Sequence, residues 1–466
     1  KDPRSKASGV LRHMNPLQEL VRRLGDVITT DPDVLPGYCR DAASWATAGA
    51  PLALARPRAT EHVQTLARWA TENRIPLVAR GAGTGVVGGA NAVNGCVVVS
   101  FERMNEILEL NDSAMYAVVQ PGVLNVELKK AAEAFDLWYA PDPASYEIST
   151  LGGNVATNAG GLCCVKYGVT GDYVLALEGV LASGERFRTG VPCRKDVAGY
   201  DLKRLLVGSE GSLALITEIT LRLRRRPKRP GTLVALFSSL EAAGRAVSRV
   251  VRAVEPALLE LMDRTTLRAV EGYAQLGIDH DAAAMLIGQS DTGNPAELEL
   301  MREACESTDP RLVYITDDEH EGQLLLRARR LAFPALERLG NVVSDDISVP
   351  LPRLPEMLRR IEVRAREQEV LVGTVAHAGD GNIHPLIVRS PGSGAEREQA
   401  LFERLMLDAV ELGGTVSGEH GIGSIKADFL NLQLDETALS LHYAVKQAFD
   451  PLGILNPGKL ILPSRR

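Results

Sequence analysis

The sequence predicts a soluble α+β enzyme with more than one domain, and three observations support this fold class. The chain has 466 residues, which is enough for two or three domains with large cores. Hydrophobic residues make up 45% and charged residues 24% of it, a balance typical of globular enzymes. Short apolar stretches with the period of strands alternate with longer stretches that have the period of helices.

Composition also excludes several classes of protein. A net charge of −7 argues against a general nucleic-acid-binding protein, and no apolar run reaches the length of about 18 residues that a membrane span needs. The six cysteines show no C-x-x-C spacing, which excludes a zinc ribbon and an iron–sulfur run, and they favour a reducing cytoplasm. Residues 1–13 precede Met14 and are interpreted as the remnant of an expression tag, and no secretory signal follows Met14.

In the first half of the chain, short strands and helices surround glycine-rich loops. The helix predicted over 60–73 has the clearest pattern, because Val63, Leu66 and Ala70 recur at helical spacing. Thr60 is a residue type that caps helices. The other predicted helices are 16–25 and 125–135, and the predicted strands are 51–55, 75–79, 97–101, 115–120 and 213–223.

The second half predicts a different sheet. Two βαβ-like units follow one another, which indicates a ferredoxin-like arrangement. Its predicted strands are 232–237, 257–262, 283–289 and 311–315, with helices at 240–254 and 295–307. Further helices are predicted at 319–339, 354–368 and 397–412.

Three loops are rich in glycine and other small residues. Residues 80–90 hold five glycines, so backbone N–H groups there can turn toward an anion without interference from Cβ atoms. Residues 151–161 and 208–212 are similar, and small side chains suit a large flat ligand that lies against backbone. No clear helix and acidic ribose partner follow the first loop, which argues against an NAD site of the Rossmann type. Tightly packed loops without a ligand are the alternative.

The segment 377–384 places two histidines around a turn. Asp380-Gly381 is a hairpin signal, and a two-residue turn there would put His377 directly opposite His384 on one face of the hairpin. Two imidazoles so placed could hold one metal ion. The alternative is a surface hairpin with incidental histidines.

Residues 418–423 place Glu419 and His420 between glycines. Adjacent side chains usually diverge, so one of them can bind a metal while the other faces a substrate. With His377 and His384, Glu419 forms a His₂Glu set, a pattern typical of catalytic metal sites with open positions. A solvent-exposed loop is the alternative.

The basic run over 222–229 contains six arginines and lysines and is interpreted as a solvated interdomain linker. Contact with an anionic membrane surface or with an acidic electron acceptor is the alternative interpretation.

These motifs together resemble one family. The ordered set is R-G-A-G-T-G (80–85), P-D-P (141–143), L-G-G-N-V-A-T-N-A-G-G (151–161), K-Y-G (166–168), G-S-E-G (208–211), H-A-G-D-G-N-I-H (377–384), G-E-H-G-I-G (418–423) and N-P-G-K (456–459). It is similar to the FAD-linked D-2-hydroxyacid dehydrogenase family, which includes D-lactate dehydrogenases, the glycolate oxidase flavin subunit and D-2-hydroxyglutarate dehydrogenase. The resemblance covers almost the whole chain after Met14.

The resemblance implies a vanillyl-alcohol-oxidase type of fold. Its FAD-binding domain, made of two α+β subdomains, would span residues 14–226. A ferredoxin-like α+β cap for the substrate would span 227–412, and residues 413–466 would return to the FAD-binding domain. The boundary between the first two domains would therefore fall within the basic run over 222–229.

The resemblance also implies where FAD binds. Its pyrophosphate would lie on residues 80–85, and the other two loops would line the rest of the cofactor. Residues 80–90 contain no histidine, so the FAD is expected to be non-covalent. The expected cofactor-binding residues are Arg80, Gly81, Ala82, Gly83, Thr84, Gly85, Gly88, Ala90, Gln120, Pro121, Gly122, Pro141, Asp142, Leu151, Gly152, Gly153, Asn154, Ala156, Thr157, Asn158, Gly160, Gly161, Tyr167, Gly168, Gly208, Glu210, Gly211, Ile216 and Asn456.

For the chemistry, the resemblance assigns His377, His384 and Glu419 as ligands of a divalent ion, zinc or manganese. It assigns His420 as the base that takes the substrate hydroxyl proton, while hydride passes to flavin N5. An arginine should clamp the substrate carboxylate. Arg329 is the candidate and Arg327 the runner-up.

Two departures bear on the substrate. D-2-hydroxyglutarate enzymes carry a lysine where this chain has Ser344 and a threonine where it has Phe333. A cation for a second carboxylate is therefore missing, so D-lactate is the expected substrate, with glycolate or 2-hydroxybutyrate next. A D-2-hydroxyglutarate dehydrogenase, a flavin subunit of a glycolate oxidase-like complex, and a metal-dependent hydrolase are the alternatives.

The expected partners follow from the same resemblance. The electron acceptor would be a quinone, a cytochrome, an electron-transfer flavoprotein or dioxygen. A homodimer and a peripheral position at the inner membrane are further expectations, and no nucleic-acid partner is expected.

Overall fold

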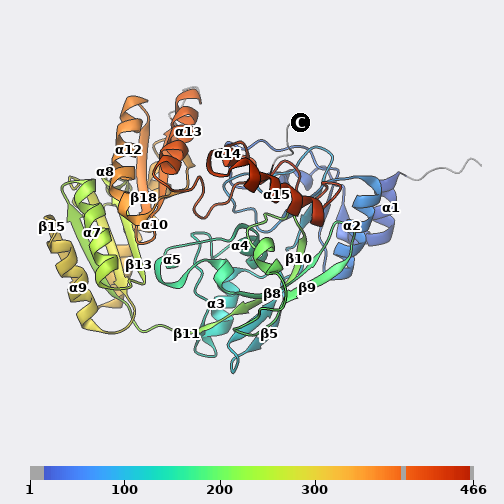
Figure 1. Cartoon of the computed structure of the whole chain (residues 1–466), viewed down its shortest axis with the longest axis horizontal. Helices are drawn as coiled ribbons and strands as arrows, with labels where there is room; N and C mark the ends of the chain where they lie inside the picture. Colours follow the sequence, from blue (N-terminus) through green and yellow to red (C-terminus); the bar gives the residue numbers. More distant parts are fainter. Residues whose placement is uncertain (1–14, 390–394, 462–466) are drawn as a thin grey trace, which may run out of the picture.

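The computed structural model describes residues 15–389 and 395–461. The tag remnant predicted over 1–13 lies outside the described residues. Figure 1 shows an N-terminal lobe, coloured blue to green and running from β1 to β11, beside a cap lobe, coloured yellow-green to orange and running from β12 to α13. The C-terminal segment, residues 413–461, carries the dark red helix α15 back over the N-terminal lobe.

A four-stranded sheet begins the N-terminal lobe, with the order β1-β2-β4-β3. Its inner strands are parallel, and β1 pairs antiparallel at the edge. Val63, Leu66 and Trp69 of α2 are fully buried in the core beside this sheet, because they share one face of the helix. The elements are α1 (Pro16–Leu24), β1 (Ile28–Thr29), β2 (Ala53–Ala55), α2 (Thr60–Asn73), β3 (Leu77–Arg80) and β4 (Val97–Ser100).

A five-stranded antiparallel sheet with the order β5-β6-β10-β8-β9 completes the N-terminal lobe. Its strands are β5 (Ile107–Asn111), β6 (Tyr116–Val119), β8 (Val174–Val180), β9 (Arg186–Gly190) and β10 (Leu215–Arg222). Short helices connect them: α3 (Asn125–Glu133), α4 (Leu151–Thr157), α5 (Cys164–Tyr167) and α6 (Leu202–Leu206). A two-stranded ribbon pairs β7 (Leu137–Trp138) with β11 (Arg224–Arg225).

The cap lobe contains an eight-stranded sheet. Its first part has the order β15-β12-β14-β13, which is the antiparallel order of a ferredoxin-like unit, and it continues through β18, β19 and β16. The predicted ferredoxin-like sheet is therefore present but is only half of a larger one. The strands are β12 (Gly231–Phe237), β13 (Leu258–Asp263), β14 (Ala284–Ser290), β15 (Pro310–Thr316), β16 (Asn341–Ser344), β17 (Ile347–Ser348), β18 (Leu371–His377) and β19 (Asn382–Arg389).

Helices cover both faces of this sheet. One core joins it to α7 (Leu240–Ala253), α9 (Pro295–Glu306), α12 (Leu354–Glu367) and α13 (Glu396–Glu411). The core on the opposite face joins it to α8 (Arg264–Ala274), α10 (Glu319–Arg330) and α11 (Ala332–Glu337).

The C-terminal segment packs on the N-terminal lobe. It contains α14 (Leu430–Gln433) and α15 (Glu436–Phe449). Beyond them, Leu77 donates its backbone N–H to the Ile454 carbonyl at 2.8 Å, and Asn456 donates to the Leu77 carbonyl at 2.8 Å. The end of the described chain therefore extends the edge of the first sheet.

Three local predictions need correction. Residues 151–161 are not wholly irregular, because α4 forms there between two caps. The Thr150 hydroxyl accepts the Gly153 N–H at 3.2 Å, and Asn158 closes the helix with φ of 52°. The single helix predicted over 319–339 breaks at Leu331, because Pro334 cannot continue the helical hydrogen bonds but fits the first turn of α11.

The third correction concerns the hairpin of β18 and β19. His377 pairs with Asn382, and His384 pairs with Val375, so the turn has four residues rather than two. The turn is longer because Gly379 is anchored outside the hairpin. Its N–H donates to the Leu259 carbonyl at 3.1 Å, and a Cβ there would lie 2.7 Å from Val165. The two histidines are diagonal neighbours, and they still share one face.

The basic run is partly packed. The Arg222 and Arg224 guanidinium groups lie 5.1 and 4.9 Å from the ring centroids of Tyr173 and Tyr167, whereas Arg225 and the residues up to Arg229 are mostly exposed. Among the described residues, no helix has both the length and the apolar character needed to cross a membrane.

Candidate active site

Backbone and small side chains from all three glycine-rich loops line one cleft in the N-terminal lobe. Glycine is needed at the closest approaches: a Cβ on Gly81 would lie 2.3 Å from the Thr150 hydroxyl, and one on Gly152 would lie 2.5 Å from Pro121. The predicted cofactor-binding residues that line the cleft are Arg80, Gly81, Ala82, Gly83, Thr84, Gly85, Ala90, Pro121, Gly152, Gly153, Asn154, Ala156, Thr157, Gly160, Glu210, Gly211 and Ile216.

The other predicted cofactor-binding residues are not among those that line the cleft, and their contact with the cofactor stays a prediction. Asn456 illustrates their placement, since its amide donates to the carbonyls of Gly89 and Glu210 at 2.8 and 2.7 Å. Burial raises the pKa of Asp142, which accepts the Cys163 N–H, to about 6. This set comprises Gly88, Gln120, Gly122, Pro141, Asp142, Leu151, Asn158, Gly161, Tyr167, Gly168, Gly208 and Asn456.

The sequence pattern did not predict several other residues of the lining. Asp41, Phe101, Pro143, Ser149 and Thr150 belong to it as well. Asp41, Phe101, Ser149 and Thr150 lie outside the motifs, so no local signal marked them, whereas Pro143 ends the P-D-P motif and could have been predicted from it. Glu419 and His420, which the sequence placed more than 200 residues after Glu210, line the same cleft. The cleft thus ends at titratable side chains.

The three predicted metal ligands meet at this end of the cleft. The Nε2 atoms of His377 and His384 each lie 3.2 Å from Oε1 of Glu419. The imidazole rings of the two histidines lie edge to face, with centroids 5.0 Å apart. Each of the three residues can offer a ligand atom within 4.8 Å of the other two. Two imidazole nitrogens and a carboxylate oxygen that converge in this way match the donor set of a divalent ion.

Glu260 of β13 fixes the orientation of His377. Its Oε1 lies 2.7 Å from His377 Nδ1, while its Oε2 accepts from Arg329 Nε at 2.7 Å. With Nδ1 directed at a carboxylate, Nε2 faces the open position, as in carboxylate–histidine–metal arrangements. Glu260 was missed, although a single charge inside the apolar stretch of β13 is a signal that could have found it.

This placement of Arg329 bears on its predicted role. Among the residues the structure describes, Glu260 is its only charged partner, and Arg329 is half-buried on α10. Arg327, the runner-up, is exposed. Arg329 therefore reaches the histidine cluster through a continuous chain of hydrogen bonds.

Charges in the cluster depend strongly on one another. Burial would lower the pKa of His377, but Glu260 and Glu419 on either side raise it well above its usual value. Burial would raise the pKa of Glu419, but His377 and His384 hold it well below its usual range. These opposite shifts have one cause: the site between Glu260 and Glu419 favours positive charge, which is what a cation placed there would supply.

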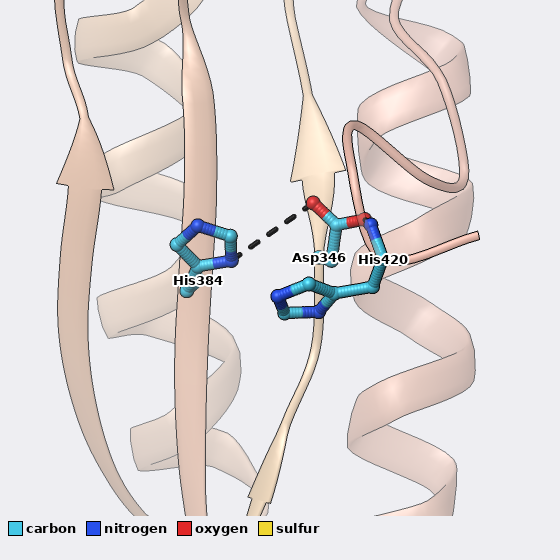
Figure 2. Close-up of side chains that lie close together, drawn as sticks. All are labelled: Asp346, His384 and His420. Atoms are coloured by element: carbon cyan, nitrogen blue, oxygen red, sulfur yellow. Dashed lines mark hydrogen bonds and ion pairs between the residues drawn. The ribbon is translucent and has the colours of Figure 1, made fainter. Parts of the chain in front are cut away.

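Asp346 organises the other side of the cluster, between β16 and β17. Figure 2 shows its carboxylate between His384 and His420, with Oδ1 3.9 Å from His384 Nδ1. The pKa of Asp346 is lowered even though burial opposes this, because His420, Lys426 and His384 stabilise the anion. Like Glu260, Asp346 was not predicted as a site residue.

His420, the predicted general base, lies beside the candidate metal ligands. It lines the cleft, and its ring stacks on His384 with centroids 4.9 Å apart. Burial lowers its pKa, so the imidazole is neutral at physiological pH and can accept a proton. Its neighbour Glu419 points toward the same cluster, since Oε1 of Glu419 lies 3.8 Å from Nε2 of His420. The two adjacent side chains therefore do not diverge as the sequence predicted.

Comparison with known families identifies the chain. A model described as "FAD binding domain" matches residues 51–190, and one described as "FAD linked oxidases, C-terminal domain" matches residues 226–460. The second match covers the cap sheet, the histidine hairpin and the Glu419-His420 loop. The chain belongs to the FAD-linked oxidases. FAD is therefore the cofactor of this FAD-linked oxidoreductase, and the glycine-lined cleft is the candidate site for it.

Curated relatives agree with the family. The chain is 41% identical to glycolate oxidase subunit GlcD of Bacillus subtilis over 89% of this chain and 90% of the relative. It is 35% identical to D-lactate dehydrogenase of Archaeoglobus fulgidus (87% and 90%) and 31% identical to D-2-hydroxyglutarate dehydrogenase of Stutzerimonas stutzeri (93% and 96%). The resemblance found in the motifs is confirmed.

Solved structures confirm the fold class. 4-Ethylphenol oxidase from Gulosibacter chungangensis superposes with a TM-score of 0.78 at 19% identity, covering 97% of both chains. p-Cresol methylhydroxylase superposes with a TM-score of 0.79 at 17% identity, also covering 97% of both. At these identities the likeness shows the fold alone.

Proposed function

We propose that this FAD-linked oxidase converts a small D-2-hydroxy acid, D-lactate in the first place, to the 2-oxo acid with the help of a divalent metal ion. One observation carries the proposal: the His377, His384 and Glu419 donors converge at the end of the FAD cleft, beside His420. The names of the relatives support the substrate class, since these proteins are a glycolate oxidase subunit, a D-lactate dehydrogenase and a D-2-hydroxyglutarate dehydrogenase.

His377, His384 and Glu419 would hold the ion, zinc or manganese. A bound ion supplies Lewis acidity, which lowers the pKa of a substrate hydroxyl. Bound FAD supplies the acceptor for the two electrons. The chain's own contribution is a neutral His420 that takes the hydroxyl proton, held beside the cleft by its backbone bond to Asp346. Glu260 keeps His377 in the tautomer that presents Nε2.

Arg329 would bind the substrate carboxylate. Glu260 engages its Nε, and the terminal nitrogens of the same guanidinium match a carboxylate. Ser344, whose hydroxyl donates to the Asp345 carbonyl, and Phe333, which is 41% exposed on α11, bring no cation for a second carboxylate. A monocarboxylate such as lactate, glycolate or 2-hydroxybutyrate is therefore favoured over 2-hydroxyglutarate.

A panel of 2-hydroxy acids tests the proposal. Each acid is mixed anaerobically with the purified flavoprotein, with and without a chelator, and the loss of flavin absorbance is followed. We expect bleaching by D-lactate and not by L-lactate, and none after chelation until zinc or manganese is restored. Full activity of the metal-stripped protein would remove the metal from the proposal, and no bleaching by any 2-hydroxy acid would refute the function.

A second candidate keeps the chemistry but adds a partner. The Bacillus subtilis and Escherichia coli relatives are named as subunits of glycolate oxidase, which favours an enzyme that passes electrons to another chain. Substrate would then bleach the flavin of the isolated chain, while quinone, cytochrome or electron-transfer flavoprotein would reoxidise it only slowly. Rapid reoxidation of the isolated chain by one of these acceptors would exclude this candidate.

A further inference from the structure

The loop that carries Glu419 and His420 is held from two sides by buried carboxylates. On the cap side, Oδ2 of Asp346 accepts three consecutive backbone N–H groups, from Gly418, Glu419 and His420, at 2.9, 2.9 and 2.8 Å. Asp346 is fully buried. One charge of the cap lobe thus sets the backbone from which both functional side chains project.

The second carboxylate comes from the N-terminal lobe. Oε1 of Glu210 accepts the Ile422 N–H at 2.7 Å, and Oε2 accepts the Gly423 N–H at 2.8 Å. Glu210 is 6% exposed, has φ of 51° and lines the FAD cleft. A non-glycine residue in this left-handed region needs support, and the Asn456 amide provides it by donating to the Glu210 carbonyl at 2.7 Å.

The fit around this contact is tight. Gly421 has φ of 91°, and a Cβ there would lie 2.8 Å from Oε1 of Glu210. On the facing loop, a Cβ on Gly160 would lie 2.2 Å from Oε2 of Glu419. The loop that carries Glu419 and His420 therefore cannot shift without displacing Glu210 or the backbone at Gly160, both of which line the cleft.

We propose that Glu210 is a positioning residue through which the FAD cleft controls the loop that carries Glu419 and His420, so that cofactor binding and metal binding are coupled. This inference rests on the proposed metal and FAD sites. Glu210 lines the first and holds the backbone of the second. Because coupling is reciprocal, the metal ion must stabilise bound FAD by the same free energy by which FAD stabilises the metal.

Glu210→Gln tests the inference. A glutamine offers one acceptor oxygen and an NH₂ group that opposes the second backbone N–H. The flavin-loaded protein is stripped of metal with a chelator and titrated with Zn²⁺, and the temperature of flavin release is recorded with and without Zn²⁺. In the wild type we expect Zn²⁺ to raise this temperature. In Glu210→Gln we expect the zinc-dependent rise to vanish and zinc affinity to fall about tenfold.

Two further variants keep the test decisive. Glu178→Gln removes another buried carboxylate of the N-terminal lobe, bound to Thr60, Thr217 and Arg188, and should keep the zinc-dependent rise. Gly421→Ala disturbs the same contact from the loop side and should lose the rise even if Glu210→Gln fails to fold.

The outcomes separate the inference from the proposed function. A wild type that binds Zn²⁺ without a shift in flavin release, or a Glu210→Gln protein with the wild-type shift, overturns the coupling. The substrate panel decides the function independently, because flavin release needs no turnover.

Discussion

The cleft in the N-terminal lobe is lined by backbone and small side chains from short glycine-rich loops. The cluster at its end consists of imidazoles and carboxylates from four segments that lie far apart in the sequence. In the cleft, added atoms collide: a Cβ on Gly81 or Gly152 would lie within 2.5 Å of a neighbour. In the cluster, removal of a side chain is the damaging change, because each charged group is stabilised by the oppositely charged group beside it. The two regions should therefore fail in opposite ways, the cleft when atoms are added and the cluster when atoms are removed.

The largest effect is expected from His384→Ala. Removing one of three ligands should abolish tight metal binding and lower turnover by about 10³-fold, since a Lewis acid contributes several kcal/mol of charge stabilisation. The protein should stay yellow, because His384 lies outside the glycine loops. Metal content per flavin and steady-state turnover measure both effects. His442→Ala, which removes an exposed histidine of α15, is the control. A His384→Ala protein with the metal content of the wild type would contradict the role of His384 as a ligand.

His420→Gln should leave both regions intact and remove only the base. Turnover is expected to fall by about 10²–10⁴-fold, with metal and flavin content unchanged. Burial lowers the pKa of His420. The wild-type imidazole should therefore stay deprotonated, and able to act as the base, at pH values below the ordinary pKa of histidine. A pH profile of kcat/KM measures this acid limb, which the variant should lack. A profile of unchanged shape would assign the proton to another group.

Glu260→Gln should have a smaller effect. The amide oxygen can still accept from His377 Nδ1, but the negative charge between His377 and Arg329 is lost. Metal affinity should fall about 10–100-fold, and the KM for the acid should rise if Arg329 binds its carboxylate. Chelator competition gives the affinity. Glu297→Gln, in the cap lobe but bonded to Ser290, is the control and should match the wild type.

The contrast between the regions also explains what the sequence could predict. The cleft motifs were visible because each is a local run of glycines, and the bounds of α2 were predicted because its apolar face is contiguous. The predicted cap was wrong, since Thr60 is the first helical residue and its hydroxyl donates to Glu178 instead of capping α2. The ligand set was visible because histidines and an adjacent carboxylate lie in short motifs. The diagonal register of the hairpin was not, since it depends on the bond from Gly379 to Leu259 of another strand.

The supporting charges were also beyond local patterns. Glu260 and Asp346 touch the site only after the eight-stranded sheet has formed, and α4 forms within a glycine-rich run because Thr150 and Asn158 cap it. Strands β8 and β9 and helices α8 and α15 were not predicted either. For the supporting charges, contacts made across the fold decided the outcome. Helices α8 and α15 begin after Asp263 and Asp435, whose side chains accept backbone N–H groups, so a local signal could have predicted them.

Gly81→Ala tests the cleft side of the contrast. Its Cβ would collide with the Thr150 hydroxyl, which caps α4 by accepting the Gly153 N–H. Displacing that hydroxyl should loosen the first turn of α4, because a capping hydrogen bond stabilises a helix by about 1 kcal/mol. The affinity for FAD should therefore fall by roughly tenfold. Gly85→Ala from the same loop, whose Cβ would stand 3.7 Å from Asp41, should lose less flavin. Fluorescence titration with FAD measures both variants.

Zinc affinity of flavin-loaded Gly81→Ala should equal that of the wild type, because the collision lies in the lining and not at Glu210. Equal flavin loss in both variants would instead trace the effect to the loop backbone.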